Sequence, residues 1–212
     1  MKVNKDDMIL YAITDRKWLG GRSLSAQVEE AIKGGATFIQ LREKNLSFKE
    51  FVEEGKEVKA VTDKYSIPLV INDNIDVALA IEADGVHLGQ SDEELLAARR
   101  RLGENKIIGV SAHNTEEARK AEAGGADYLG VGDLFGTGTK KNTVKVTGDI
   151  LTDICASVKI PVVGIGGISK DNITNLMGTG ISGVAVISAI FSSDDIEASS
   201  KELRALSEAV RL

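Results

Sequence analysis

Cysteine and proline are both scarce in this sequence of 212 residues, which has one cysteine, Cys155, and two prolines. A single cysteine excludes an internal disulfide framework and is typical of proteins in a reducing cytoplasm. Two prolines leave no proline-rich linker, and the length suits one large domain better than two. Aromatic residues make up only 4% of the chain, but an apolar content of 42% is enough for a buried core. We therefore expect one domain over residues 1–212.

Long apolar runs and an excess of positive charge are also absent. No stretch approaches the ~20 apolar residues of a membrane helix, and residues 1–15 lack the apolar segment and cleavage site of a secretory signal. The formal net charge of −6 argues against general nucleic-acid binding, which requires a basic face. We expect a soluble, cytoplasmic protein that binds neither nucleic acid nor a membrane. The sequence leaves open whether it forms a homo-oligomer.

The chain does contain a regular alternation of short apolar runs and longer amphipathic ones. Several short runs are apolar at successive residues, as in parallel strands that are buried on both faces. They predict strands at residues 9–14, 37–42, 68–73, 85–90, 106–112, 128–133, 161–167 and 183–190. Among the amphipathic runs, residues 23–35, 91–103 and 194–212 predict helices, the first with a serine cap and a glycine stop.

Eight strand–helix pairs in a chain of this length favour an α/β fold, the single-domain (β/α)8 TIM barrel. A doubly wound sheet with helices on both faces is the alternative. Polar residues gather at the carboxyl ends of nearly all predicted strands, whereas the opposite ends, such as residues 66–70 and 158–163, carry few. Because barrel enzymes keep their chemistry at the carboxyl-end face, this asymmetry predicts a site there.

Two carboxylates, Asp73 and Asp92, follow neighbouring predicted strands. Oxygen ligands with room for water suit Mg²⁺ better than zinc, which prefers histidine and cysteine. Each aspartate alone is equally well explained as a helix cap. Their arrival at adjacent strand ends favours a shared metal site.

Three cations, Arg42, Lys44 and Lys140, are expected around the same opening. Arginine offers a bidentate fork to phosphate oxygens, and lysine offers a mobile point charge. A lone lysine in a loop is usually only a solvated surface group. Together with the two carboxylates, however, the three cations are typical of a metal–diphosphate site.

A second anion signal is the glycine-rich segment 164–169, which follows the seventh predicted strand. Backbone N–H groups in such a turn, followed by a helix N-terminus, can hold a phosphate, and in barrels this site follows strands seven and eight. The segment does not match the dinucleotide fingerprint, because position 169 is Ser169. A tight turn that simply needs glycine is the alternative explanation.

Nine ordered segments carry a family resemblance over about residues 9–191. The most specific are "QLREK" at 40–44, the "ND" of residues 72–73, "HLGQSD" at 87–92 and "TKK" at 139–141. With them the chain resembles thiamine-phosphate synthase. That resemblance implies the Mg²⁺-dependent condensation of 4-amino-2-methyl-5-hydroxymethylpyrimidine diphosphate with 4-methyl-5-(2-phosphoethyl)thiazole. It also implies a dissociative displacement at the pyrimidine methylene and release of thiamine phosphate and pyrophosphate.

The resemblance also implies which residues form the site. The pyrimidine diphosphate would contact Gln40, Leu41, Arg42, Glu43, Lys44, Asn72, Ser111 and Lys140. The thiazole phosphate would contact Thr137, Gly138, Thr139, Gly167, Ile187 and Ser188. The catalytic residues would be Arg42, Lys44, Ser111 and Lys140, and the ligands of Mg²⁺ would be Asp73 and Asp92.

One departure from the family concerns the sixth loop, where Asp133 and Gly136 stand at positions that are usually proline. Without these prolines we expect a more flexible loop, with a new carboxylate beside a phosphate site. Two alternatives stay open at this point. One is a thiazole tautomerase-like barrel, which would not need the full set of cations. The other is a barrel that binds a phosphorylated metabolite without catalysis.

Overall fold

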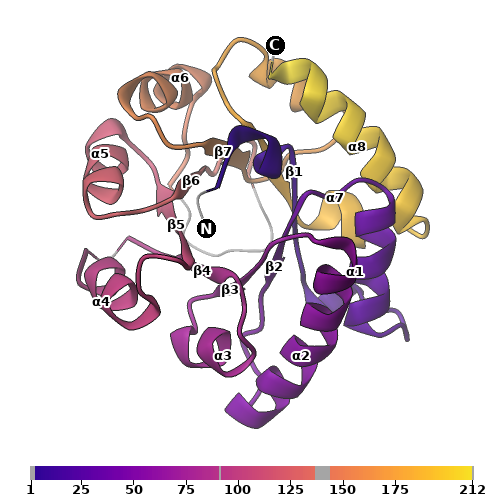
Figure 1. Cartoon of the computed structure of the whole chain (residues 1–212). Helices are drawn as coiled ribbons and strands as arrows, with labels where there is room; N and C mark the ends of the chain where they lie inside the picture. Colours follow the sequence, from indigo (N-terminus) through magenta and orange to yellow (C-terminus); the bar gives the residue numbers. More distant parts are fainter. Residues whose placement is uncertain (1–2, 91, 137–143, 212) are drawn as a thin grey trace.

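The computed structural model of the chain describes residues 3–90, 92–136 and 144–211, with the backbone alone for residues 92–94. Eight parallel strands form a closed barrel in chain order, and β1 pairs with β8 to complete it (Figure 1). The strands are β1 Leu10–Ile13, β2 Phe38–Leu41, β3 Leu69–Asn72, β4 Gly85–Leu88, β5 Ile107–Ala112, β6 Tyr128–Val131, β7 Val162–Ile165 and β8 Gly183–Val186. All eight predicted strands are confirmed, and the closed ring excludes the doubly wound alternative.

Helices surround the barrel (Figure 1). The α-helices are α1 Leu24–Lys33, α2 Phe48–Tyr65, α3 Ile75–Ala80, α4 Asp92–Leu102, α5 Thr115–Ala123, α6 Gly148–Ser157, α7 Ser188–Phe191 and α8 Ile196–Val210. Short 3-10 helices are η1 Lys5–Met8, η2 Arg16–Trp18 and η3 Ile173–Leu176. The seventh unit differs from the expected pattern, because β7 is followed by η3 alone. In turn, β8 is followed by both α7 and α8.

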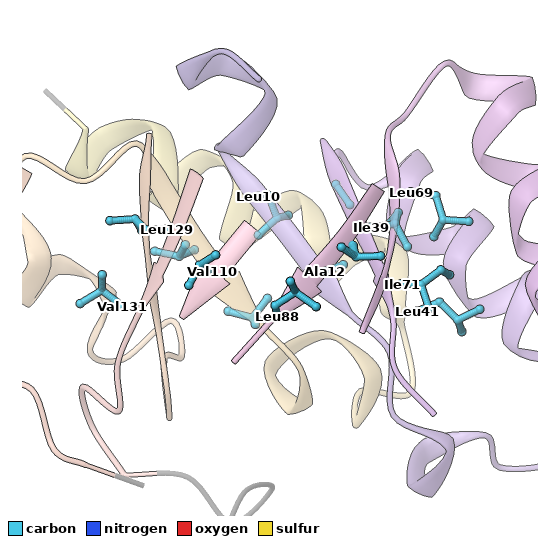
Figure 2. Packing of buried hydrophobic residues seen from close by; sticks show 14 of the residues in the cluster. Leu10, Ala12, Ile39, Leu41, Leu69, Ile71, Leu88, Val110, Leu129 and Val131 are labelled. Atoms are coloured by element: carbon cyan, nitrogen blue, oxygen red, sulfur yellow. The ribbon is translucent and has the colours of Figure 1, made fainter. Parts of the chain in front are cut away.

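Side chains alternate between two buried layers, because successive residues of a strand point to opposite faces. Outward-facing residues pack against the helices, and Figure 2 shows them on neighbouring strands, among them Leu10, Ile39, Leu69 and Leu129. Inward-facing apolar residues form a second cluster inside the barrel: Tyr11, Ile13, Phe38, Val70, Ile107, Tyr128, Val163 and Ala185.

The amino end of the barrel is closed by apolar side chains. Met8, the last residue of η1, is fully buried in the interior cluster, and Val3 packs against it. Asn4 caps η1 through a reciprocal pair of hydrogen bonds with Asp7, which fixes this short helix beside the strand ends. The interior is therefore filled from the amino end, and open space is left at the carboxyl end.

Candidate active site

A cavity of about 120 Å³ opens at the carboxyl ends of the strands. Seven of the residues predicted to bind substrate line it, and they come from both halves of the barrel: Gln40, Arg42, Asn72, Ser111, Gly167, Ile187 and Ser188. The first four follow or end strands β2, β3 and β5, and the last three follow β7 and β8. The fold therefore brings both predicted substrate sites to one cavity.

Among the described residues, Arg42 is the arginine or lysine that lines the cavity. It follows β2 directly, and its backbone N–H donates to the hydroxyl of the fully buried Thr14 at 3.0 Å. Its side chain is half-buried and forms no ion pair with any described residue. A cation that is partly shielded from water and lacks a carboxylate partner favours an anionic ligand.

Lys44 and Asp73 form an ion pair beside this cavity, with 2.7 Å between Nζ and Oδ2. Asp73 is not the cap of α3, because Asn74 holds that position and accepts from the backbone N–H of Val77. The backbone of Asp73 is left-handed, with φ of 59°, a conformation that aspartate tolerates better than most residues. Of the two explanations of Asp73, the helix cap is therefore wrong, and its carboxylate is left at the strand end.

Several predicted site residues lie outside the described part of the chain. They are Thr137, Gly138, Thr139 and Lys140, and the side chain of Asp92. Within residues 3–90, 95–136 and 144–211, no three side chains of His, Cys, Asp or Glu gather as a metal cluster. The ligand set predicted here has two carboxylates, and Asp73 is the one that the structure describes. Its oxygen donors and its position at the mouth fit a hard cation such as Mg²⁺.

Leu41 and Glu43 are predicted substrate contacts that do not line the cavity. Leu41 is fully buried in the layer between the barrel and its helices. Glu43 is also buried, and its carboxylate accepts from Arg16 Nε at 3.3 Å. Arg16 donates as well to Glu54 at 2.5 Å. Only the backbones of Leu41 and Glu43 remain as candidate contacts to a ligand.

The Glu43 carboxyl group has an unusual environment. Burial, followed by the hydrogen bond and charge of Glu54, raises the pKa of Glu43 to about 7, although Arg16 opposes the shift. Glu43 Oε1 and Glu54 Oε2 are both buried without a hydrogen-bond partner among the described residues. A proton held between the two carboxyl groups would satisfy both atoms.

The glycine-rich turn after β7 lies against the start of the sixth loop. A Cβ atom on Gly167 would lie 2.2 Å from the carbonyl oxygen of Gly136, and one on Gly166 would lie 2.2 Å from Asp133 Oδ1. Both glycines also have positive φ. Packing of this turn against the sixth loop therefore requires glycine at both positions, whether or not the turn also binds a phosphate. The helix expected directly after this turn is absent, since the described chain forms only η3 there.

Asp133 organises the described beginning of the sixth loop. Its carboxylate accepts from the backbone N–H of Gly136 at 3.0 Å, and its backbone pairs with Val144 and Val146 across the loop. The side chain is 95% buried and lines the cavity. The expected flexibility concerns residues 137–143, which lie outside the described residues. Asp133 itself holds the loop base by hydrogen bonds.

A line of hydrogen-bonded side chains crosses the barrel, and all of its members except Tyr128 line the cavity. It runs from Gln40 through Tyr11, Tyr128 and His87 to Ser111. The sequence predicts its two ends, Gln40 and Ser111, as site residues, but it does not predict Tyr11 or Tyr128 as members of this line. A usable signal existed, because Tyr11 and Ile13 alternate toward the interior of β1 as Gln40 does in β2.

Comparison with known proteins adds an independent line of evidence. The family model described as thiamine monophosphate synthase matches residues 10–190. A thiamine-phosphate synthase of Clostridium novyi is 54% identical over 92% of this chain and 96% of its own length. One from Clostridium acetobutylicum is 54% identical over 90% of each chain. The chain belongs to the thiamine monophosphate synthase family.

A solved structure of the same family agrees closely with this fold. The thiamine phosphate pyrophosphorylase of Pyrococcus furiosus is 42% identical and covers 97% of this chain and 98% of its own, with a TM-score of 0.88. Members of the thiamine monophosphate synthase family are transferases of thiamine biosynthesis, and this chain is an enzyme of that class. Among the described residues, no helix has the length and apolar character that crossing a membrane requires.

Proposed function

We propose that the chain condenses 4-amino-2-methyl-5-hydroxymethylpyrimidine diphosphate with 4-methyl-5-(2-phosphoethyl)thiazole to give thiamine phosphate and pyrophosphate. The observation that carries the proposal is Arg42, a half-buried cation in the cavity wall without an acidic partner among the described residues. Its counter-ion is the diphosphate. Membership of the thiamine monophosphate synthase family supports this assignment.

The diphosphate occupies the side of the cavity formed by β2, β3 and β5. Arg42 presents a planar fork to its oxygens, and Lys44 is held next to it by Asp73. Asn72 and Ser111 offer neutral hydrogen bonds from the neighbouring strands. Lys140 adds a third positive charge in the proposal, from a part of the chain outside the described residues.

Asp73 and Asp92 are the proposed ligands of Mg²⁺. When it is bound, the ion neutralises negative charge that builds up on the departing pyrophosphate. The Lys44–Asp73 pair suits this role, because the two partners are about half exposed and such pairs contribute little to stability. Asp73 would therefore be available to hold the ion at small cost, and Lys44 would be available to the diphosphate.

The reaction breaks the bond between the pyrimidine methylene carbon and the diphosphate oxygen, and the bonding electrons leave with pyrophosphate. The lone pair of the thiazole nitrogen then forms the new carbon–nitrogen bond. Neither step needs a protein nucleophile or a strong base. The residues need only neutralise charge, align the two rings and exclude water, and an apolar wall with Ile165 and Val163 serves the last purpose.

The thiazole phosphate occupies the side formed by β7 and β8. Gly167, Ile187 and Ser188 line the cavity there, and no side chain in the described part of the chain caps the start of α7. Short helices in this position of a barrel commonly hold phosphate. Thr137, Gly138 and Thr139 complete the proposed set. A cytoplasmic location and one domain over residues 1–212 remain predictions that accompany this function.

The test is incubation of the purified chain with both substrates and Mg²⁺. Thiamine phosphate is measured by mass spectrometry and pyrophosphate by an enzyme-coupled assay. The proposal predicts both products in equal amounts, and neither when the thiazole is omitted. Binding of the thiazole phosphate without any product would contradict it and would favour a barrel that only binds the metabolite. Conversion of a thiazole precursor alone would instead favour a tautomerase.

A further inference from the structure

Five polar side chains inside the barrel form a continuous hydrogen-bonded series, here named the interior polar chain: Gln40, Tyr11, Tyr128, His87 and Ser111. Gln40 Nε2 donates to Tyr11 Oη at 2.5 Å, and the two tyrosine hydroxyls are 2.8 Å apart. Tyr128 Oη lies 2.9 Å from His87 Nδ1, and His87 Nε2 lies 3.2 Å from Ser111 Oγ. These five residues come from five different strands.

The barrel is shaped around this chain. A Cβ atom on Gly109 would lie 2.1 Å from Cζ of Tyr128, so only glycine leaves room for the tyrosine ring. Gly130 likewise leaves space beside the ring of His87. Phe38 packs edge-on against both tyrosine rings, with centroid distances of 4.8 and 5.5 Å. The hydroxyl groups of the chain therefore have little freedom to move.

The orientation of the Gln40 amide, whose nitrogen faces Tyr11 Oη, sets the direction of the hydrogen bonds along the chain. Burial raises the pKa of both Tyr11 and Tyr128 well above the usual range, so each hydroxyl keeps one proton to donate. Because Tyr11 accepts from Gln40, its own proton goes to Tyr128. Tyr128 then donates to His87 Nδ1. This leaves the proton of a neutral imidazole on Nε2.

The two ends of the chain consequently present opposite hydrogen-bonding groups to the cavity. Gln40 has used its amide nitrogen, so its carbonyl oxygen remains as an acceptor. Ser111 accepts from His87 Nε2, so its hydroxyl proton remains as a donor. Reversal of one end alone would leave two donors or two acceptors facing each other within the chain, at the cost of a hydrogen bond.

We propose that the interior polar chain selects the pyrimidine substrate by its amino group, with Tyr128 and His87 as positioning residues. The inference rests on the proposed function. Gln40 accepts from the ring amino group, and Ser111 donates to an acceptor on the same substrate. A pyrimidine with an oxo group in place of the amino group presents an acceptor to an acceptor and is rejected. Tyr128, which does not line the cavity, keeps both ends in this state.

The tautomer of His87 tests the chain without any substrate. The sequence has only two histidines, so nitrogen-15 resonances of the imidazoles can be assigned with a His113→Gln variant. At pH 8 the proposal predicts a neutral His87 ring with the proton on Nε2. A proton on Nδ1 in the wild-type protein would overturn it. This result does not depend on whether the protein makes thiamine phosphate.

Tyr128→Phe tests selection of the substrate. The variant keeps the ring but removes the central hydroxyl, and loss of one hydrogen bond to the site is expected to raise KM for the pyrimidine diphosphate about tenfold. KM for the thiazole phosphate is expected to stay unchanged. The preference for the amino over the oxo diphosphate, measured as a ratio of inhibition constants, is expected to fall by a similar factor.

Tyr65→Phe is the matched control, because Tyr65 also loses a hydrogen-bonded hydroxyl, but on the outer surface beside Glu29. It is expected to behave as wild type. Tyr11→Phe interrupts the same chain at another point, so the double variant with Tyr128→Phe should lose no more than either single one. Equal ring selectivity in Tyr128→Phe and Tyr65→Phe would refute the proposal, even for a wild-type protein that makes thiamine phosphate.

Discussion

The buried carboxyl pair beside the cavity makes stability depend on pH in an unusual direction. Glu43 has only 4% of its side chain exposed, and it shares Arg16 with Glu54. Its pKa is raised from the usual 4.5 to about 7, chiefly by burial and then by Glu54. The group therefore binds its proton more tightly in the folded than in the unfolded protein.

The sign and size of the effect follow from this difference. Below pH 4.5 Glu43 carries a proton in both states, and its contribution to stability is complete. As the pH rises toward 7, the unfolded chain loses the proton while the folded protein retains it, so the free energy of unfolding falls. At about 1.4 kcal/mol per pH unit, the total loss is about 3 kcal/mol by pH 8.

Glu43→Gln removes this dependence. The amide has the same shape, keeps an oxygen for Arg16 and can donate to Glu54, but it has no proton to lose. Urea unfolding at pH 5, 6, 7 and 8, followed by circular dichroism, gives the free energy of unfolding of each protein. The difference between variant and wild type is expected to grow in favour of the variant by about 3 kcal/mol over this range.

Glu53→Gln provides the control, because Glu53 lies next to Glu54 on α2 but is 65% exposed. Its dependence on pH is expected to match that of the wild type. The same slope in Glu43→Gln and wild type would show that Glu43 is ionised in the folded protein at pH 5 and that the two carboxyl groups do not share a proton.

Three further substitutions test other parts of the site. Asp133→Ala removes the acceptor for Gly136 N–H. It is expected to lower the free energy of unfolding in urea by about 1 kcal/mol and to raise KM for the thiazole phosphate. Asp133→Asn should keep both quantities close to wild type, and equal losses in the two variants would contradict a structural role. Gly109→Ala forces Tyr128 to move and should lower the free energy of unfolding by about 1–3 kcal/mol; wild-type stability would show that the interior relaxes freely. Lys44→Gln should raise KM for the pyrimidine diphosphate more than tenfold and change the thermal midpoint little, because the lysine is about half exposed; an unchanged KM would exclude it from the site.

The fold could be predicted because each strand is a short apolar run that ends near glycine or polar residues. Residues 107–112 and 162–165, for example, need no distant contact to be recognised as strands. The seventh unit was harder, since residues 168–182 lack the apolar stripe of a helix and form only η3. The local sequence pattern does not predict secondary structure where tertiary packing determines which element forms.

From the sequence, the position of the candidate site residues at the strand ends could be predicted, but the direction in which each side chain points could not. The motif predicts contacts from the whole segment 40–44, but strand periodicity sends Gln40 and Arg42 to the cavity and turns Leu41 away from it. Tyr11 and Tyr128 were missed because 117 residues separate them in the chain. Only the closed barrel brings their hydroxyls together.

The most direct test of the central claim is a calorimetric titration of inorganic pyrophosphate into the protein with and without Mg²⁺. We expect Mg²⁺ to tighten binding in the wild type, and Asp73→Asn to abolish this gain while Arg42→Gln weakens binding under both conditions. The same gain from Mg²⁺ in Asp73→Asn, or undiminished binding by Arg42→Gln, would contradict a metal-assisted diphosphate site at this end of the barrel.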